Sequence, residues 1–562
     1  CKAVDMNLIL ILALVSLCWA ALPVVDLGYE LHRANALSSS NGLYNFSNIR
    51  YAAPPLDDLR FRAPVWPKPN RSQIQDGSTG RVCPQALPTW EEELQPSFLL
   101  SVLTGKQFNQ STDLSAYPYI PDKLDPRTTE DCLFLDVVVP QEIFHRAQKK
   151  KGELVAKKNL APVMVWIYGG GFAEGDKSLY NPAGMMQQSK ARGEEMVYVA
   201  LNYRLGAFGW LAGSSLTANG TANAGLYDQR LALKWVQKNI HLFGGDPSRI
   251  TVMGESAGGA SIMHQITAFG GKNGSAPFHQ AILQSPAWDP IVSPTQQEDT
   301  LQQFLGILNV SSVEEARRLP SSTLIAGNAY QIGTKGYYGN FVYGPVVDDK
   351  FAPRLPGQLL LSGDFDRNIS VMVGHNTNEG IAFLNPNATK SNFLPTLLKQ
   401  ILPTISNNVT RYVTDVLYPA RFDGKWGYTS PLARAELILS DVAITCNTDY
   451  LNRAYDNQTY AYQFSIPPGL HGQDVLYTFF HNGTSTISSD MASVTNATVA
   501  HAMQDWFVSF TYAGVPRSSR TPVFPRHGER GQLMNIGNDT IVPMRDMTNN
   551  PRCRFWQSAP YS

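Results

Sequence analysis

The chain contains 562 residues, of which 43% are hydrophobic, and its formal net charge is zero. This length exceeds that of most single domains, although one large α/β enzyme domain can reach it. The balanced charge argues against nucleic acid as a main partner. The lysine run at residues 149–151, with Lys157 and Lys158 nearby, is therefore interpreted as a solvated loop.

The N-terminal residues have the pattern of a secretory signal peptide. Lys2 precedes an apolar run over residues 8–17. That run is too short to cross a bilayer, and the small residues Ala20 and Ala21 follow it. No other stretch reaches membrane-spanning length, so the sequence predicts a secreted protein without a transmembrane segment.

This pattern sets the expected division of the chain. Residues 1–20 are expected to be a signal peptide, and residues 21–562 are expected to form one domain. The chain begins with cysteine, and Met6 is a plausible true start, which would make residues 1–5 an upstream artefact.

Cysteines and glycosylation sequons fit the same compartment. Four cysteines in a secreted chain predict two disulfides, with the connectivity left open. Many evenly spread sequons favour the secretory pathway of a eukaryote. The cysteines are Cys83, Cys132, Cys446 and Cys553. The sequons begin at Asn45, Asn70, Asn109, Asn219, Asn273, Asn309, Asn368, Asn387, Asn408, Asn457, Asn482, Asn496 and Asn538.

Short apolar strands alternate with helical stretches along the rest of the chain. Strands separated by helices imply a mostly parallel, doubly wound sheet, in which ligands bind beyond the carboxyl ends of the strands. Segments 84–130 and 385–440 look least regular and are interpreted as insertions. The expected strands cover residues 163–168, 196–201, 249–253, 280–284, 369–373 and 460–464, and the expected helices include 228–240 and 499–512.

A glycine-rich turn follows the first of these strands. Tyr168 precedes three glycines, at positions 169–171, and Phe172 follows them. Glycine N–H groups can approach a substrate oxygen without obstruction by a side chain, so this turn could hold an oxyanion. A plain turn is the alternative. A nucleotide loop is disfavoured, because neither G-x-x-x-x-G-K-[ST] nor G-x-G-x-x-G with its acidic partner is present.

A second turn has the pattern of a nucleophile elbow. Gly254-Glu255-Ser256-Ala257-Gly258-Gly259 follows the expected strand 249–253, and a helix would begin at Ala257. Glycines flank such a serine because the turn is strained and the strand and helix pass close together. G-x-S-x-G also occurs by chance as an ordinary loop, so the stretch alone leaves both interpretations open.

Several motifs in a fixed order together resemble the type-B carboxylesterase/lipase family, also called the cholinesterase-like α/β-hydrolases, and most of all its secreted fungal members. The resemblance runs from about Val25 to Trp556. It implies the α/β-hydrolase fold, with a large, mostly parallel sheet flanked by helices and insertions that form a lid-like loop and a cap. The motifs are Tyr168–Phe172, Asn202–Gly206, Gly225–Gln229, Phe243–Pro247, Gly254–Gly259 and, earlier in the chain, Glu130–Leu135.

The resemblance implies a catalytic triad in the chain order serine, acid, histidine. Ser256 is then the nucleophile. Glu379 is the acid, in a stretch similar to the family's acid loop (374–380), and His471 is the base, in a stretch similar to its histidine turn (469–474).

Composition alone leaves competitors for two of these roles. Asp348 and Asp349 compete for the acid. His481 competes for the base, although it lies in a surface-like stretch and lacks a following glycine. His375 and His264 are interpreted as structural, the first beside the acid and the second two helical turns beyond the serine.

The resemblance also implies supporting residues. The N–H groups of Gly170, Gly171 and Ala257 would form the oxyanion hole, and Glu255 and Ser285 would surround the histidine. No cysteine lies between Cys132 and Cys446, so a family disulfide is missing and the loop at 270–277 is expected to be held by packing alone. The implied pairs are the ion pairs Arg204–Asp228 and Arg60–Glu130 and the disulfides Cys83–Cys132, closing the lid-like loop, and Cys446–Cys553.

These residues imply a serine esterase or lipase that acts through an acyl-enzyme. His471 would take the proton of Ser256, which attacks the ester carbonyl, while Glu379 fixes the imidazole. Neither a metal nor a cofactor is needed, and the sequence has no H-E-x-x-H motif or paired C-x-x-C motifs.

The sequence says less about which ester is the substrate than about the reaction. The loop from Cys83 to Cys132 mixes apolar residues with acidic ones at 91–93, so it could be a lid that makes transient contact with lipid or a loop that lies flat on the core. Asp122 stands where cholinesterases carry a tryptophan for choline, which disfavours choline esters.

Two functions of other classes are disfavoured. A non-catalytic adhesion protein of the neuroligin-like branch usually lacks a triad member and has a membrane anchor. A secreted peptidase is disfavoured by the family motifs.

Overall fold

The computed structural model describes residues 22–38, 42–121, 123–148, 160–390, 392–485 and 492–561. The expected signal peptide, the lysine run at 149–151 with Lys157 and Lys158, and Asp122 lie outside the described residues.

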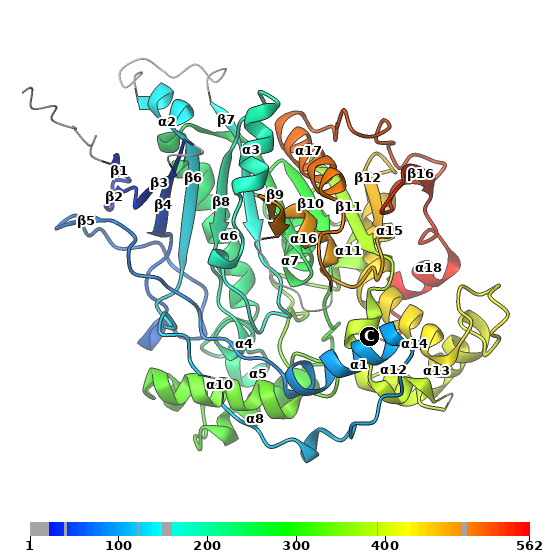
Figure 1. Ribbon diagram of the computed structural model, residues 1–562. Coiled ribbons are helices and arrows are strands. Elements are labelled where there is room, and N and C mark those ends of the chain that lie inside the picture. Colours follow the sequence, from blue (N-terminus) through cyan, green and yellow to red (C-terminus); the bar gives the residue numbers. More distant parts are fainter. Residues whose placement is uncertain are drawn as a thin grey trace, which may run out of the picture.

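An 11-stranded sheet forms the centre of the molecule (Figure 1). Neighbouring strands from β8 through β7, β9, β10, β11 and β12 to β15 pair in parallel, whereas the pairs at both edges are antiparallel. The mostly parallel sheet expected from the sequence is therefore confirmed. In spatial order the strands are β16 (Ile541–Arg545), β15 (Gln532–Ile536), β12 (Tyr460–Phe464), β11 (Ser370–Asn376), β10 (Gln280–Gln284), β9 (Gly245–Glu255), β7 (Ala161–Ile167), β8 (Val197–Leu201), β6 (Phe134–Pro140), β4 (Leu43–Arg50) and β3 (Ala36–Ser38).

Helices flank this sheet and bury its central strands (Figure 1). Every residue of β7 and of β8 is buried, as expected for parallel strands covered on both faces. One continuous hydrophobic core runs from Val25 to Tyr561. The flanking helices include α3 (Ala183–Ala191), α6 (Ala224–Asn239), α7 (Ala257–Ile266), α11 (Pro356–Ser362), α15 (Cys446–Ala454), α16 (Gln473–Thr478) and α17 (Ala497–Ala513).

Further helices lie along the lower edge of the view in Figure 1, beyond the sheet. They come largely from segments 84–130 and 385–440. The expectation of irregular structure was wrong for residues 89–104 and for most of 385–440, whereas the described part of 105–130 is largely without helix or strand. The helices are short and interrupted by π-helical turns at Trp90–Leu94 and Val413–Leu417, which breaks the helical periodicity that a sequence pattern needs. They are α1 (Gln95–Thr104), α8 (Pro294–Ile307), α10 (Ser321–Lys335), α12 (Leu394–Ile401), α13 (Asn407–Tyr412) and α14 (Pro431–Ser440).

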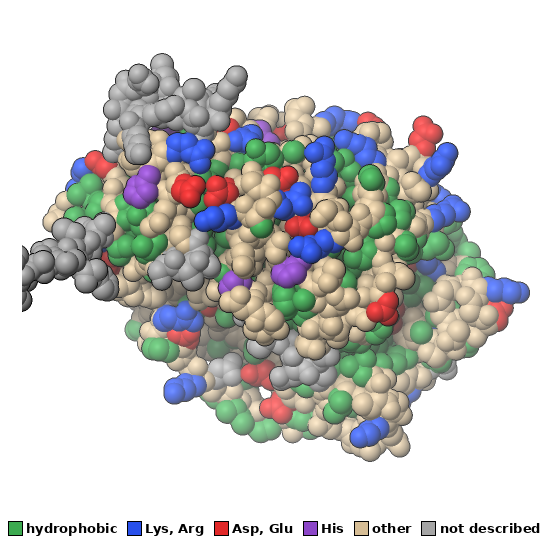
Figure 2. All heavy atoms as spheres, turned by 45° about the horizontal axis from the view of Figure 1, so that its top comes forward, with side chains coloured by type: hydrophobic (Ala, Val, Ile, Leu, Met, Phe, Trp, Pro, Cys, Tyr) green, Lys and Arg blue, Asp and Glu red, His purple; other side chains and the backbone are tan. Residues whose placement is uncertain are grey.

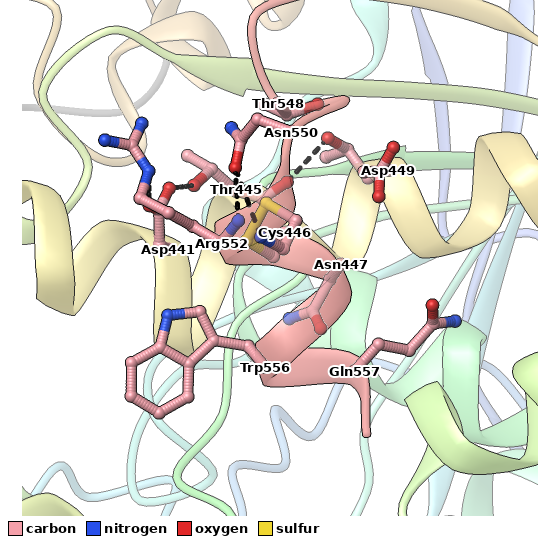
Figure 3. Close-up of a disulfide and its surroundings, with 12 residues drawn as sticks. Asp441, Thr445, Cys446, Asn447, Asp449, Thr548, Asn550, Arg552, Trp556 and Gln557 are labelled. Carbon is pink, nitrogen blue, oxygen red and sulfur yellow. Dashed lines mark hydrogen bonds and ion pairs between the residues drawn. A yellow bond between two sulfur atoms is a disulfide. The ribbon is translucent and has the colours of Figure 1, made fainter. Parts of the chain in front are cut away.

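Two disulfides close long loops. Cys83–Cys132 closes the segment that carries α1. Cys446–Cys553 joins α15 to α18 (Pro551–Gln557), the last helix (Figure 3). Beside this second bridge, Arg552 Nε lies 3.1 Å from Asp441 Oδ2. The late segment is thereby fixed to the body of the molecule.

Both ion pairs implied by the family resemblance are present and buried. Arg60 donates to both carboxylate oxygens of Glu130, and Arg204 does the same to Asp228. The loop at 270–277 is not held by packing alone, which corrects that expectation. The Ala276 N–H donates to Asp366 Oδ2 at 2.7 Å, because the carboxylate reaches the loop backbone from a neighbouring turn.

The surface carries charges of both signs. Figure 2 shows one face, on which basic and acidic side chains are interspersed. Within the described residues, no helix has the length and apolar character needed to cross a membrane.

Candidate active site

Ser256 occupies a strained turn between β9 and α7. Its backbone has φ 55° and ψ −123°, a region that residues with side chains rarely adopt. The flanking glycines are required by close backbone contacts. A Cβ atom on Gly258 would lie 2.0 Å from the carbonyl oxygen of Ile167, and one on Gly254 would lie 2.7 Å from the same atom. The turn therefore presents the serine at the carboxyl end of β9, as a nucleophile elbow requires.

His471 contacts Glu379 directly. Its Nδ1 lies 2.5 Å from Glu379 Oε2, and Glu379 is fully buried. Burial alone would raise the pKa of Glu379, but the charge and hydrogen bond of His471, together with the other donors, hold this pKa below its usual value. The carboxylate therefore stays ionised and fixes which imidazole nitrogen carries the proton.

The acid and histidine loops are joined through their backbones. The Asn378 N–H donates to the Gly469 carbonyl oxygen at 2.8 Å, and Asn378 pairs with Leu470 as an isolated parallel bridge. This pairing brings residues 92 positions apart in sequence into contact.

Ser285 supports the acid rather than the histidine ring. Its Oγ donates to Glu379 Oε1 at 2.6 Å, and the Asn376 N–H donates to the same oxygen at 2.5 Å. Ser285 therefore acts on His471 only through Glu379, which its hydroxyl contacts.

The other imidazole nitrogen is free of protein hydrogen bonds. His471 Nε2 has no hydrogen-bond partner among the described residues, and it lies 3.4 Å from Glu255 Oε1. Catalytic hydrogen bonds are often absent or long before substrate binds. Burial opposes a charge on His471, but Glu379 and Glu255 outweigh it and raise the pKa of His471. Burial raises the pKa of Glu255.

The glycine turn has the backbone that an oxyanion site needs. Gly170 and Gly171 have φ of 98° and 57°, which favour glycine. Their N–H groups donate no hydrogen bond to a described backbone carbonyl. Ala257 is the first residue of α7, where an N–H has no acceptor within the helix.

A small pocket of about 50 Å³ opens beside Ser256. It lies between the sheet and the helices beyond its lower edge in Figure 1. Its walls come from the loops after β10 and α10 and from the region of α14. Its lining is largely apolar and includes Phe341 and Phe383. The Phe383 ring also packs edge-on against His471, with ring centres 5.0 Å apart. Phe383 thus lies between the pocket at Ser256 and the histidine, because its ring lines the one and packs on the other.

The competing residues lie elsewhere. Asp348 accepts hydrogen bonds from the backbone N–H groups of Lys350 and Ala352, so it closes a turn. His264 Nδ1 donates to the Ala260 carbonyl oxygen within α7 at 2.9 Å. Asp349, His481 and His375 do not line the pocket, and neither do Glu379 and His471, which are distinguished by their mutual contact.

Among the described residues, one cluster has residue types that can bind a metal, but its cysteines are not free thiols. Asp441, Cys446 and Cys553 lie within ligand distance of one another, but the two cysteines are bonded to each other (Figure 3). A disulfide offers no thiolate to a metal.

Three polar residues of the site were not anticipated. Asn376 Nδ2 donates to Ser285 Oγ and to the buried Asp474, each at 3.2 Å. Both lie inside the stretches that suggested the acid and the histidine, so the motifs contained the signal. Asp289 lines the pocket, and no motif pointed to it.

Comparison with known proteins supports the same assignment of fold. The family model described as the carboxylesterase family matches residues 32–556. Carboxylesterase patB of Aspergillus clavatus is 40% identical over 567 residues, which cover 99% of each chain. Carboxylesterase patB of Penicillium expansum is 39% identical, covering 96% of this chain and 97% of its own. Lipase 4 of Diutina rugosa is 31% identical, covering 88% of this chain and 89% of its own.

Solved structures of esterases have the same fold. The crystal structure of Aspergillus niger EstA has a TM-score of 0.77 and 26% identity, covering 96% of this chain and 98% of its own. A thermophilic PNB esterase, at 24% identity and a TM-score of 0.70, shows the likeness of fold. The region that the family model matches, residues 32–556, includes every candidate site residue.

Proposed function

Because this chain belongs to the carboxylesterase family and is a carboxylic ester hydrolase, we propose that it cleaves esters through an acyl-enzyme on Ser256. His471 is the base and Glu379 the orienting acid. The observation that carries the proposal is the 2.5 Å contact between His471 Nδ1 and the buried Glu379, together with the elbow turn of Ser256, whose neighbour Glu255 lies 3.4 Å from His471 Nε2.

The proposed reaction has two halves. Ser256 Oγ attacks the ester carbonyl carbon while His471 Nε2 accepts its proton. The tetrahedral intermediate then expels the alcohol, which takes that proton. In the second half, His471 accepts a proton from water, and the water oxygen attacks the acyl carbon. The carboxylic acid leaves and Ser256 regains its proton.

Backbone N–H groups stabilise the developing oxyanion in this proposal. Gly170, Gly171 and Ala257 would donate to it, and each such donor is worth about 3 kcal/mol of the barrier. Glycine at the first two positions keeps the approach open. A Cβ atom on Gly171 would lie 2.3 Å from the Phe341 ring, so no larger residue fits there.

The preferred substrates are proposed to be compact esters. The pocket beside Ser256 is small, and aromatic rings form much of its wall. We expect kcat/KM for p-nitrophenyl esters to be highest between C2 and C6 and to fall towards C16. The comparison is made below and above each ester's solubility limit, with a fluorophosphonate-treated sample as the control.

Lipolysis is the second candidate, favoured by exposed apolar side chains in the segment closed by Cys83–Cys132. Activity that rises sharply when a C8 to C16 ester passes its solubility limit would favour a lipase with transient lipid contact and would contradict the compact-ester proposal. The exposed side chains are Leu100, Leu103, Ile120 and Leu124.

Secretion and domain organisation are part of the same proposal. Removal of residues 1–20 would leave residues 21–562 as one secreted domain. The two disulfides and the large core, which runs from Val25 to Tyr561, support this division.

Glu255→Gln is expected to move the acid limb of the kcat/KM profile to lower pH. Activity requires neutral His471, and the negative charge of Glu255, 3.4 Å from Nε2, favours the protonated ring. Removing that charge lowers the pKa of His471, by about one to three units for a charge this close. The profile is measured with p-nitrophenyl butyrate from pH 5 to 10. An unmoved acid limb would show that Glu255 carries no charge in the working enzyme.

A further inference from the structure

The pocket beside Ser256 contains one charged group. Among its described lining residues, Asp289 is the sole ionisable carboxyl group in a wall of rings, aliphatic side chains and glycines. Pockets of this kind use their few polar groups to orient a ligand and to set specificity. The role of this carboxylate is not explained by the proposed triad.

Asp289 is held close to the nucleophile. It lies on the loop that follows β10, and the N–H of Ala287 on that loop donates to the Ser256 carbonyl oxygen at 3.2 Å. The position of Asp289 relative to the elbow is therefore fixed by the backbone.

The carboxylate has one protein hydrogen bond and is partly exposed. Oδ2 accepts from Asn340 Nδ2 at 2.8 Å, and no cation pairs with Asp289 among the described residues. Burial raises the pKa of Asp289 to about 6, against the effect of the Asn340 hydrogen bond. In a largely apolar pocket, a carboxylate with one neutral protein partner has acceptor capacity left for a donor on the ligand.

We propose that Asp289 determines specificity by accepting a hydrogen bond from a hydroxyl or ammonium group of the substrate, so that the preferred esters carry such a donor near the scissile carbonyl. This rests on the proposed function, because the bound ester must occupy the pocket at Ser256. A site built around an acceptor rejects analogues that lack the donor, since the acceptor is then left unpaired.

Matched esters test the proposal. On the acyl side they are p-nitrophenyl 3-hydroxybutyrate, 3-aminobutyrate and butyrate, and on the alcohol side 2-hydroxyethyl and propyl butyrate. kcat/KM is measured for the wild type, Asp289→Leu, Asp289→Asn and the control Asp299→Leu, an exposed acid on α8 outside the pocket. Fluorophosphonate titration counts the reactive serines in each sample, so that rates refer to folded enzyme.

The wild type is expected to prefer at least one donor-bearing ester over its matched parent by about tenfold or more. Asp289→Leu is expected to bring that ratio close to one, Asp289→Asn to reduce it in part, and Asp299→Leu to keep it. Preference for the amino ester alone identifies an ammonium donor, and preference for a hydroxy ester identifies a hydroxyl.

Two results would overturn the proposal: a wild type that treats every matched pair alike, or substitutions of Asp289 that leave the wild-type ratio unchanged. If Asp289→Leu yields no reactive serine, the Asp289→Asn ratio decides. A wild type that neither reacts with fluorophosphonate nor hydrolyses any ester would contradict the proposed function itself, which separates that failure from this one.

Discussion

Replacing Ser256 with alanine is expected to lower kcat/KM for p-nitrophenyl butyrate by about 10⁴- to 10⁶-fold while leaving the fold intact. Without the hydroxyl no acyl-enzyme forms, and only the oxyanion donors and the binding pocket remain to accelerate attack by water. Alanine adopts the turn at φ 55° and ψ −123° no less readily than serine, so the thermal midpoint should change little. Steady-state kinetics and a thermal melt measure the two quantities.

Ser261→Ala is the matched control. Ser261 lies on α7, one turn beyond the elbow, and its hydroxyl donates to the Ala257 carbonyl oxygen at 2.7 Å. It does not line the pocket, so its removal should cost some stability and little activity. Ser256→Ala enzyme that keeps more than about one hundredth of wild-type kcat/KM would contradict the assignment of the nucleophile.

Glu379→Gln is expected to cost about 10³- to 10⁴-fold in kcat/KM. Glutamine keeps the volume and can still accept from Ser285, but it removes the negative charge that stabilises the protonated ring. The pKa of His471 should fall as well, because Glu379 is the larger electrostatic cause of its elevation. The acid limb should therefore move to lower pH together with the loss of rate, which a pH series of kcat/KM measures.

Glu436→Gln provides the comparison for this substitution. Glu436 is a partly buried carboxyl group, which accepts from the Gly380 N–H at 3.2 Å and so supports the same loop. It does not contact His471, and its replacement should leave the rate within a few-fold of the wild type. Equal losses for both variants would show that loop integrity, rather than the Glu379 charge, limits the rate.

The central strands and the elbow could be predicted from the sequence because their signals are local. β10 and β12 have the expected bounds, and α7 begins at the expected Ala257. Apolar runs bounded by polar or glycine residues define such strands, and close backbone contacts at Gly254 and Gly258 leave room only for glycine. These features depend on neighbours in sequence or on a single crossing of strand and helix.

Other features depend on long-range contacts that no local pattern contains. The direction of the Ser285 hydroxyl is set by Glu379, 94 residues later. The partner of Asp289 is Asn340, which comes from the loop after α10. The helices in segments 84–130 and 385–440 were missed because π-helical turns, at Trp90–Leu94 and Val413–Leu417, interrupt the helical periodicity. Motif resemblance suggested the proposed triad, whereas Asp289, the group proposed to select a substrate, lies on a loop whose placement requires the whole fold.

Covalent labelling tests the central claim most directly. The purified protein is treated with a fluorophosphonate, its intact mass is measured, and the modified peptide is sequenced by mass spectrometry. The account predicts one adduct per chain, located on Ser256, with loss of esterase activity in proportion to labelling and no adduct on Ser256→Ala. An adduct on another residue that accompanies inactivation, or full ester hydrolysis by a chain that takes up no label, would contradict it.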